Sequence, residues 1–121
     1  MKKVLALIAF AVLVMTSSGA FAEAKQDFTL INKTGYRIEK VYVSPNNSDD
    51  WEEDVLGRGV LDDGENVHIT FHRSATGCSW DLKVVYDDNE AAVWHGIDLC
   101  SVEKITIRWN KSTGVTSAKF D

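Results

Sequence analysis

The sequence of 121 residues is long enough for one small domain but too short for a TIM barrel or a doubly wound dinucleotide-binding fold. It contains 13 basic and 18 acidic residues, and because Lys2 and Lys3 lie in a predicted leader, the rest of the chain carries a net charge of −7. A negative domain repels phosphate backbones, which argues against nucleic acid as a partner.

The first 22 residues predict an export signal. Lys2 and Lys3 precede the apolar run Val4–Met15, and Ala20-Phe21-Ala22 supplies the small residues that a signal peptidase recognises. Cleavage after Ala22 would place residues 23–121 in the periplasm or outside the cell. The apolar run is shorter than the roughly 20 residues of a membrane span, so no membrane anchor is expected after cleavage. An uncleaved anchor is the alternative.

The rest of the chain alternates apolar and polar residues in the manner typical of β-strands. Turn sequences such as Asp62-Asp63-Gly64 separate short runs, and only Trp51–Leu56 looks helical, for a single turn. We therefore expect one all-β domain, a small antiparallel β-sandwich of about six to eight strands with one short helical turn; a barrel is the alternative. The predicted strands cover residues 28–32, 37–43, 67–72, 80–86, 91–97, 104–109 and 115–120.

Two cysteines, Cys78 and Cys100, flank a predicted hairpin. If residues 88–90 form its loop, the antiparallel register places Cys78 opposite Cys100 and buries Trp80 beside them. A two-residue loop would leave the cysteines one position out of register. Export into an oxidising compartment allows a disulfide. Closing a loop of about 22 residues would stabilise the fold by roughly 3 kcal/mol.

Several stretches resemble a group of small exported bacterial proteins. They are Asn32-Lys33-Thr34-Gly35, Val41-Tyr42-Val43-Ser44-Pro45, Trp51 with Asp54, Cys78-Ser79-Trp80-Asp81-Leu82, Tyr86-Asp87-Asp88 and Ile97-Asp98-Leu99-Cys100. Members are often labelled argininosuccinate lyases. Such lyases are large, mostly helical tetramers with sites between subunits, an architecture that about 99 β-patterned residues are too few to build. The resemblance therefore implies a small exported β-rich protein without a particular activity.

Acidic residues concentrate between positions 49 and 65, where eight carboxylates accompany one base, Arg58. Loop carboxylates at one end of a β-sandwich can bind Ca²⁺, although the EF-hand spacing is absent. A solvated acidic surface, with no cofactor, is the interpretation that we favour. The candidate ligands are Asp49, Asp50, Asp54, Asp62 and Asp63, with Asp87 and Asp88 in another predicted loop.

Histidines and catalytic motifs give little support for an enzyme. His68 and His72 share a strand face but lie about 13 Å apart by strand rise, too far to chelate one ion. With His95, they are expected at the surface. No Gly-x-Ser-x-Gly elbow is present, and oxidised cysteines would offer no thiolate. We therefore expect no enzyme activity, with a small hydrolase as the remaining alternative.

The four tryptophans separate into core and surface candidates. Trp80 and Trp109 fall on the apolar faces of their predicted strands, whereas the side that Trp94 occupies stays open. Trp51 lies among acidic residues, where it could contact a sugar or a protein. The interpretation that we favour is a plug that folds the acidic loop onto the sandwich.

These features favour an exported, non-catalytic β-sandwich that binds a protein partner or assembles with itself. The export signal, the β-pattern and the lack of a catalytic motif all point in this direction. The alternative is a calcium-dependent binding module that contacts carbohydrate through Trp51.

Overall fold

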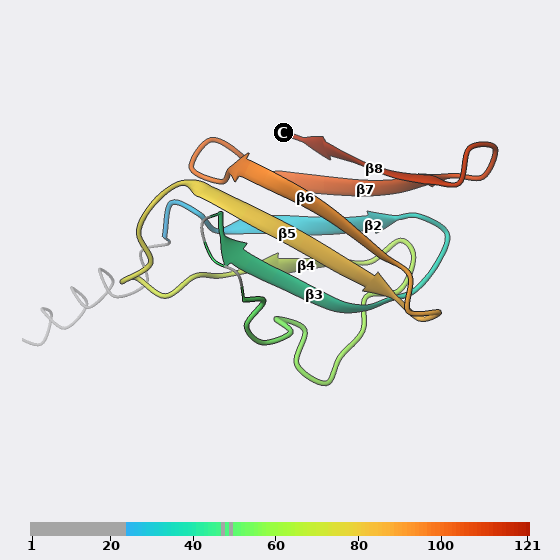
Figure 1. Ribbon diagram of the computed structural model, residues 1–121, viewed down its shortest axis with the longest axis horizontal. Coiled ribbons are helices and arrows are strands. Elements are labelled where there is room, and N and C mark those ends of the chain that lie inside the picture. Colours follow the sequence, from blue (N-terminus) through green and yellow to red (C-terminus); the bar gives the residue numbers. More distant parts are fainter. Residues whose placement is uncertain (1–23, 47, 49) are drawn as a thin grey trace, which may run out of the picture.

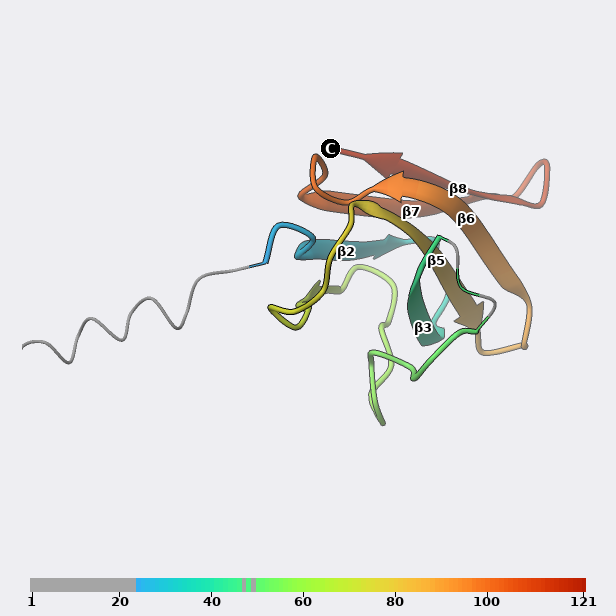
Figure 2. The same ribbon diagram turned by 60° about the vertical axis from the view of Figure 1, so that its left-hand side comes forward.

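The computed structural model of the protein describes residues 24–46, 48 and 50–121, so the predicted leader and Asp49 lie outside the described residues. Within these ranges the strands are β2 (Phe28–Lys33), β3 (Ile38–Pro45), β4 (Asn66–Ile69), β5 (Ser79–Tyr86), β6 (Ala91–Asp98), β7 (Lys104–Asn110) and β8 (Val115–Phe120). They form two sheets, with strand orders β4-β2-β7-β8 and β3-β5-β6, that pack as two layers (Figure 1, Figure 2). The predicted all-β sandwich is confirmed.

One strand pairing is parallel rather than antiparallel. β2 runs antiparallel to β4, with Leu30 opposite Val67, but parallel to β7, with Leu30 opposite Ile105. The other pairings, β3–β5, β5–β6 and β7–β8, are antiparallel. Because β2 and β7 are far apart in the sequence, no hairpin fixes their relative direction.

The helical turn expected at Trp51–Leu56 is not formed, and the described residues contain no helix. Two tight turns take its place, since Gly57 N donates to Asp54 O (3.0 Å) and Gly59 N donates to Leu56 O (2.9 Å). Gly57 adopts φ 61°, a left-handed conformation that interrupts helical progress. In the described part of the chain, no helix is long and apolar enough to span a membrane.

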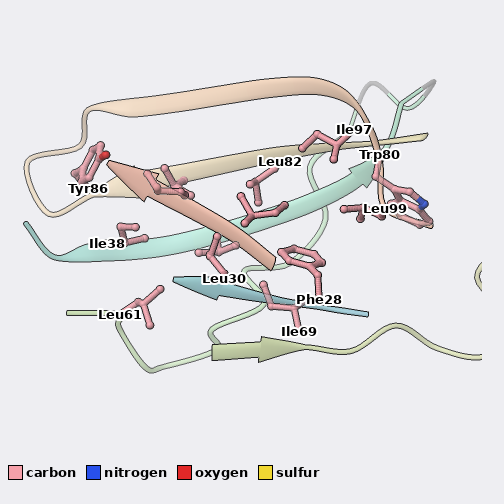
Figure 3. Close-up of a cluster of buried hydrophobic side chains, with 14 residues drawn as sticks. Phe28, Leu30, Ile38, Leu61, Ile69, Trp80, Leu82, Tyr86, Ile97 and Leu99 are labelled. Carbon is pink, nitrogen blue, oxygen red and sulfur yellow. The ribbon is translucent and has the colours of Figure 1, made fainter. Parts of the chain in front are cut away.

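Alternate strand residues fill the space between the two sheets (Figure 3). Trp80, 8% exposed, packs its ring edge-on against Phe71 with the centroids 4.9 Å apart, and its indole N–H donates to Gly77 O (3.1 Å). Trp80 is therefore buried as predicted, whereas Trp109 is only half-buried. The buried apolar residues are Phe28, Leu30, Ile38, Val41, Leu61, Ile69, Trp80, Leu82, Val84, Tyr86, Ile97, Leu99, Ile105 and Ile107.

Asn32 is a fully buried polar residue at the end of β2. Its Nδ2 donates to Tyr36 O (2.8 Å) and Leu61 O (2.9 Å). Its Oδ1 accepts hydrogen bonds from Thr34 N (3.0 Å) and Thr34 Oγ1 (2.7 Å). One amide side chain thus ties the β2–β3 turn to the segment that enters β4.

The β5–β6 hairpin turns one residue earlier than predicted. Residues 87–89 form its loop, and Tyr86 N donates to Glu90 O (2.8 Å). Asn89 adopts φ 72°, a left-handed conformation that Asn tolerates better than most residues other than glycine. The predicted register, which has residues 88–90 as the loop, is therefore wrong at this end.

A bulge in β6 then shifts the pairing. Leu82 faces Trp94, but two positions earlier along β5 Trp80 faces Ile97, so β6 accommodates one additional residue. Gly96 lies in the bulge with φ 65°, a conformation that favours glycine. The shift brings the ends of β5 and β6 closer to the register that the two cysteines require.

Cys78 and Cys100 form the predicted disulfide beyond this bulge. Their Cα atoms are 5.2 Å apart, and Leu99 N donates to Cys78 O (2.8 Å) beside the bridge. Since Leu99 is the residue opposite Cys78, the bridge joins residues that are offset by one position. A disulfide of this kind fits a compartment outside the reducing cytoplasm.

We expect the disulfide to stabilise the protein by roughly 3 kcal/mol, because it spans 22 residues of sequence and restricts the unfolded chain. The double variant Cys78→Ser/Cys100→Ser should unfold at correspondingly lower urea, while Ser79→Ala/Ser101→Ala serves as a neighbouring control. Mass spectrometry of unreduced exported protein should show the two cysteines linked. Two alkylatable thiols in that material would contradict the expectation.

The crossover, residues 50–65, connects β3 to β4 and pairs with the edge of β3 on the side of the sandwich that we call the closed side. Val55 N donates to Val41 O (2.8 Å), and Ile38 and Leu61 exchange two backbone hydrogen bonds of 2.9 Å each. The outer edge of β3 therefore has backbone partners within the chain. Figure 1 shows the crossover on the side opposite β6 and β8.

Candidate functional site

Several acidic side chains of the crossover accept hydrogen bonds from groups within the protein. Their donors are Val41 N and Leu56 N for Asp54 (2.9 and 3.0 Å), Gly35 N for Asp63 (2.8 Å) and Arg37 Nε for Asp62 (2.7 Å). Asp50 is exposed, and its carbonyl accepts from Ser44 Oγ (2.9 Å). Of the residues that the structure describes, no crossover acids form a group of three within 4.8 Å.

We expect no calcium-specific stabilisation of this protein. Binding Ca²⁺ through Asp54 or Asp62 would compete with hydrogen bonds that these carboxylates already make. Melting curves in calcium, magnesium and sodium chlorides at equal ionic strength should therefore coincide. A calcium-specific rise of several degrees that Asp49→Asn/Asp50→Asn/Asp54→Asn abolishes would reverse this conclusion.

Trp51 lies against the outer face of the three-stranded sheet. Its ring centroid is 6.3 Å from that of Tyr42, and Lys83 Nζ lies 5.8 Å from the Trp51 centroid and 5.7 Å from the Tyr42 centroid. The side chain is half-buried. Cation–π contact with Lys83 therefore holds the start of the crossover on the sheet, an arrangement that matches the plug interpretation.

Cysteine and aspartate side chains come together at the base of the hairpin. Among the described residues, Cys78, Asp98 and Cys100 are the group close enough to hold one ion. The two sulfurs are joined in the disulfide and offer no thiolate. Asp98 Oδ1 accepts from Cys100 N (3.1 Å), which shapes the turn after β6. The group is therefore explained by the bridge and its turn.

The histidines lie in separate surroundings. His68 Nδ1 is 3.1 Å from Thr29 Oγ1, and His72 Nδ1 is 2.7 Å from Ser74 Oγ. All three histidines are exposed, as predicted. Of these, His95 contacts a buried charged group.

Asp81 is a buried carboxylate at the β6 bulge. Its Oδ1 accepts from Asn46 Nδ2 and Gly96 N (2.9 Å each), and its Oδ2 lies 3.0 Å from His95 Nδ1. Burial acts to raise the pKa of Asp81, but the hydrogen bonds from Asn46, His95 and Gly96 together outweigh it, so this pKa lies below its usual value. The carboxylate thus fixes the bulge by gathering three donors.

The lowered pKa of Asp81 predicts a loss of stability in acid. An unfolded aspartate has a pKa of about 3.9, so ionised Asp81 stabilises the fold above that pH. The contribution disappears as the pH falls through the lower pKa of the folded protein. Urea unfolding at about pH 6 and about pH 3 should show a smaller pH effect in Asp81→Asn than in the parent protein. Asp88→Asn, an exposed change in the same hairpin, is the control. Equal pH effects in all three proteins would contradict the assignment.

The side of the sandwich opposite the crossover, formed by β6 and β8, is the open side. Both views place β6 beside the β7–β8 hairpin (Figure 1, Figure 2). The β5–β6 register directs the backbone N–H and C=O groups of Ala91 and Val93 away from β5. In the β7–β8 register, the backbone N–H and C=O groups of Thr116 and Ala118 likewise point away from β7. The open side therefore presents two strand edges.

A cleft of about 560 Å³ lies between these edges at the hairpin end. Tyr36 and Trp109 contact each other edge to face, with their ring centroids 5.1 Å apart, and both line it. Tyr86 Oη, 3.2 Å from Thr116 Oγ1, connects the two sheets within the cleft. Exposed carboxylates at the β5–β6 turn complete the lining: Asp87 and Asp88 in the loop and Glu90 directly after it.

The electrostatic field of the loop reaches the phenol in the cleft. Burial raises the pKa of Tyr86 above its usual value, and the negative charge of Asp88 acts in the same direction against the hydrogen bond with Thr116. Arg37, which follows Tyr36, pairs with Asp62 (2.7 Å). The cleft thus combines aromatic walls with a negative rim, which favours cations over anions.

The sequence did not identify this cleft. Tyr36 follows the β2–β3 turn and Trp109 lies in β7, so their contact depends on the packing of the two sheets. From the sequence, Asp87 and Asp88 are candidate calcium ligands in a loop, and their place at the rim of an aromatic cleft depends on the same packing. The sequence carries no local signal for this contact, because Tyr36 and Trp109 belong to segments that are far apart in the chain.

No family model and no curated protein matches this chain. Among solved structures, it is similar to an NMR structure of a protein from Eubacterium rectale, with a TM-score of 0.56. The match has 13% sequence identity and covers 78% of this chain and 85% of the other. At that identity the likeness concerns the fold alone.

Proposed function

We propose that this protein is an exported, non-catalytic β-sandwich that binds a protein partner along its open side. The observation that supports the proposal is the contrast between the edge of β3 and the edges of β6 and β8. The crossover supplies backbone partners to β3, while β6 and β8 present backbone donors and acceptors beside a cleft. Exposed strand edges are ready templates for an added strand.

The chemistry of the two edges suits this role. The first half of β6 is uncharged and consists of Ala91, Ala92, Val93 and Trp94. The side chain of Val93 is 40% exposed. On β8, Val115 is 55% exposed. Natural proteins protect unused edges with charges or bulges. The β6 bulge at Gly96 interrupts only the second half of that strand. The first half can accept a partner strand.

Export agrees with the disulfide, and the periplasm or the extracellular space is the proposed location. The predicted leader, residues 1–22, would direct the chain there. The oxidised cysteines leave no thiolate for nucleophilic catalysis, which supports a binding role.

Comparative capture tests the proposal. Val93→Lys/Val115→Lys places two charges on the open side, and Val55→Lys/Val60→Lys places the same charges on the crossover at similar exposure. Partners captured from the native exported fraction should be lost with the first pair and retained with the second. Equal capture by both variants would locate the interface elsewhere. Self-association of the protein would appear as a concentration-dependent change in its sedimentation coefficient.

A further inference from the structure

We propose that the cleft on the open side receives an arginine or lysine side chain of the bound protein. This inference rests on the proposed function, because it names what one part of the partner must carry. Backbone pairing alone does not distinguish one partner sequence from another. A pocket for a basic side chain would add that selectivity.

The aromatic walls provide the first argument. A guanidinium or ammonium group binds favourably over the face of a tryptophan or tyrosine ring. The protein already uses this contact elsewhere, where Lys83 Nζ lies within 6 Å of the Tyr42 and Trp51 centroids, at 5.7 and 5.8 Å. Within the described residues, the Tyr36–Trp109 pair has no such cation. Tyr36 is 44% exposed, so its ring is accessible to an external cation.

The charges around the cleft provide the second argument. Asp87, Asp88 and Glu90 are exposed on one rim. Asp88 Oδ1 accepts from Glu90 N (2.9 Å), which holds that carboxylate in the hairpin loop. The nearby positive charge of Arg37 is paired with Asp62. A cation that enters the cleft therefore meets negative charge and aromatic surface together.

The neighbouring strand edge explains why the cation should belong to a polypeptide. Ala91 and Val93 line the cleft and direct backbone groups away from β5. An extended segment that pairs with them would point alternate side chains toward the space between the sheets. The volume of about 560 Å³ lies in the range of clefts that bind small groups, and it is ample for one long basic side chain.

Paired peptides test the inference directly. The probes are a blocked pentapeptide Val-Thr-Arg-Thr-Val and the same peptide with neutral, nearly isosteric citrulline in place of arginine. In ¹⁵N NMR titrations the arginine peptide should shift the Trp109 indole signal and the amides of residues 88–93. The citrulline peptide should bind about tenfold more weakly, since it lacks the charge that the rings and the carboxylates recognise.

Variants that neutralise carboxylates test whether those at the rim of the cleft cause the preference for arginine. Asp87→Asn/Asp88→Asn/Glu90→Gln should remove the preference for arginine, whereas Asp50→Asn/Glu52→Gln/Glu53→Gln, the same charge change on the crossover, should preserve it. Equal affinity for the two peptides at β6 would overturn the cation pocket and leave strand binding intact. Shifts confined to other surfaces, or none at millimolar peptide, would also overturn it. The capture experiment separately decides whether the open side binds a partner.

Discussion

Replacing Trp80 with alanine is expected to lower the free energy of unfolding by about 3–5 kcal/mol. The indole is 8% exposed, contacts Phe71 edge to face and donates to Gly77 O. Its removal would leave a cavity beside the disulfide and a carbonyl without its donor. Because small domains hold only about 5–15 kcal/mol in total, much of the stability would be lost.

Urea unfolding followed by circular dichroism measures the effect. Trp51→Ala is the matched control, since Trp51 is half-buried on the outer face of a sheet and should lose clearly less stability. A loss below about 1 kcal/mol for Trp80→Ala would show that this side chain is not part of the core.

Asn32→Ala is expected to cost about 3 kcal/mol or more, because it would leave several buried polar groups without partners. Nδ2 satisfies the carbonyls of Tyr36 and Leu61, and Oδ1 accepts from Thr34 N and Oγ1. Water cannot readily replace these contacts, since Asn32 is fully buried. Asn32→Asp tests the same point differently, as a carboxylate cannot donate to either carbonyl.

The control for this site is Asn66→Ala, a change of the same kind at an exposed position in β4. It should remain within about 0.5 kcal/mol of the parent protein. If Asn32→Ala were equally mild, the hydrogen bonds around Asn32 would not determine how the crossover joins the sandwich.

Similar residues have different surroundings on the two sides of the sandwich. On the closed side, Asp54 and Asp62 hold backbone and guanidinium groups, and Trp51 has Lys83 as its cationic neighbour. On the open side, the hairpin carboxylates and the Tyr36–Trp109 pair line a cleft. The closed side therefore maintains the fold, whereas the open side has the groups that a partner could bind.

The sequence by itself determined the features that depend on local pattern. Alternating apolar residues predict strands because each strand must bury one face, and they located all seven strands of the described chain to within a few residues. Two cysteines around one hairpin were enough to predict the Cys78–Cys100 disulfide, since they allow a single pairing within the chain. Trp80 was identified as core by the same alternation.

Only the tertiary structure decided the features that depend on how distant segments meet. The β5–β6 loop begins one residue earlier than the alternating pattern predicts, because Asn89 adopts a left-handed conformation. The bulge at Gly96, whose N–H donates to Asp81, then offsets the pairing of the two strands. The parallel β2–β7 contact could not follow from a local pattern, as no short connection links the two strands. Trp109 is half-buried rather than part of the predicted core. Its neighbour Tyr36 comes from a distant segment after the β2–β3 turn, and sheet packing places both side chains at the edge of the sandwich, where they line a cleft.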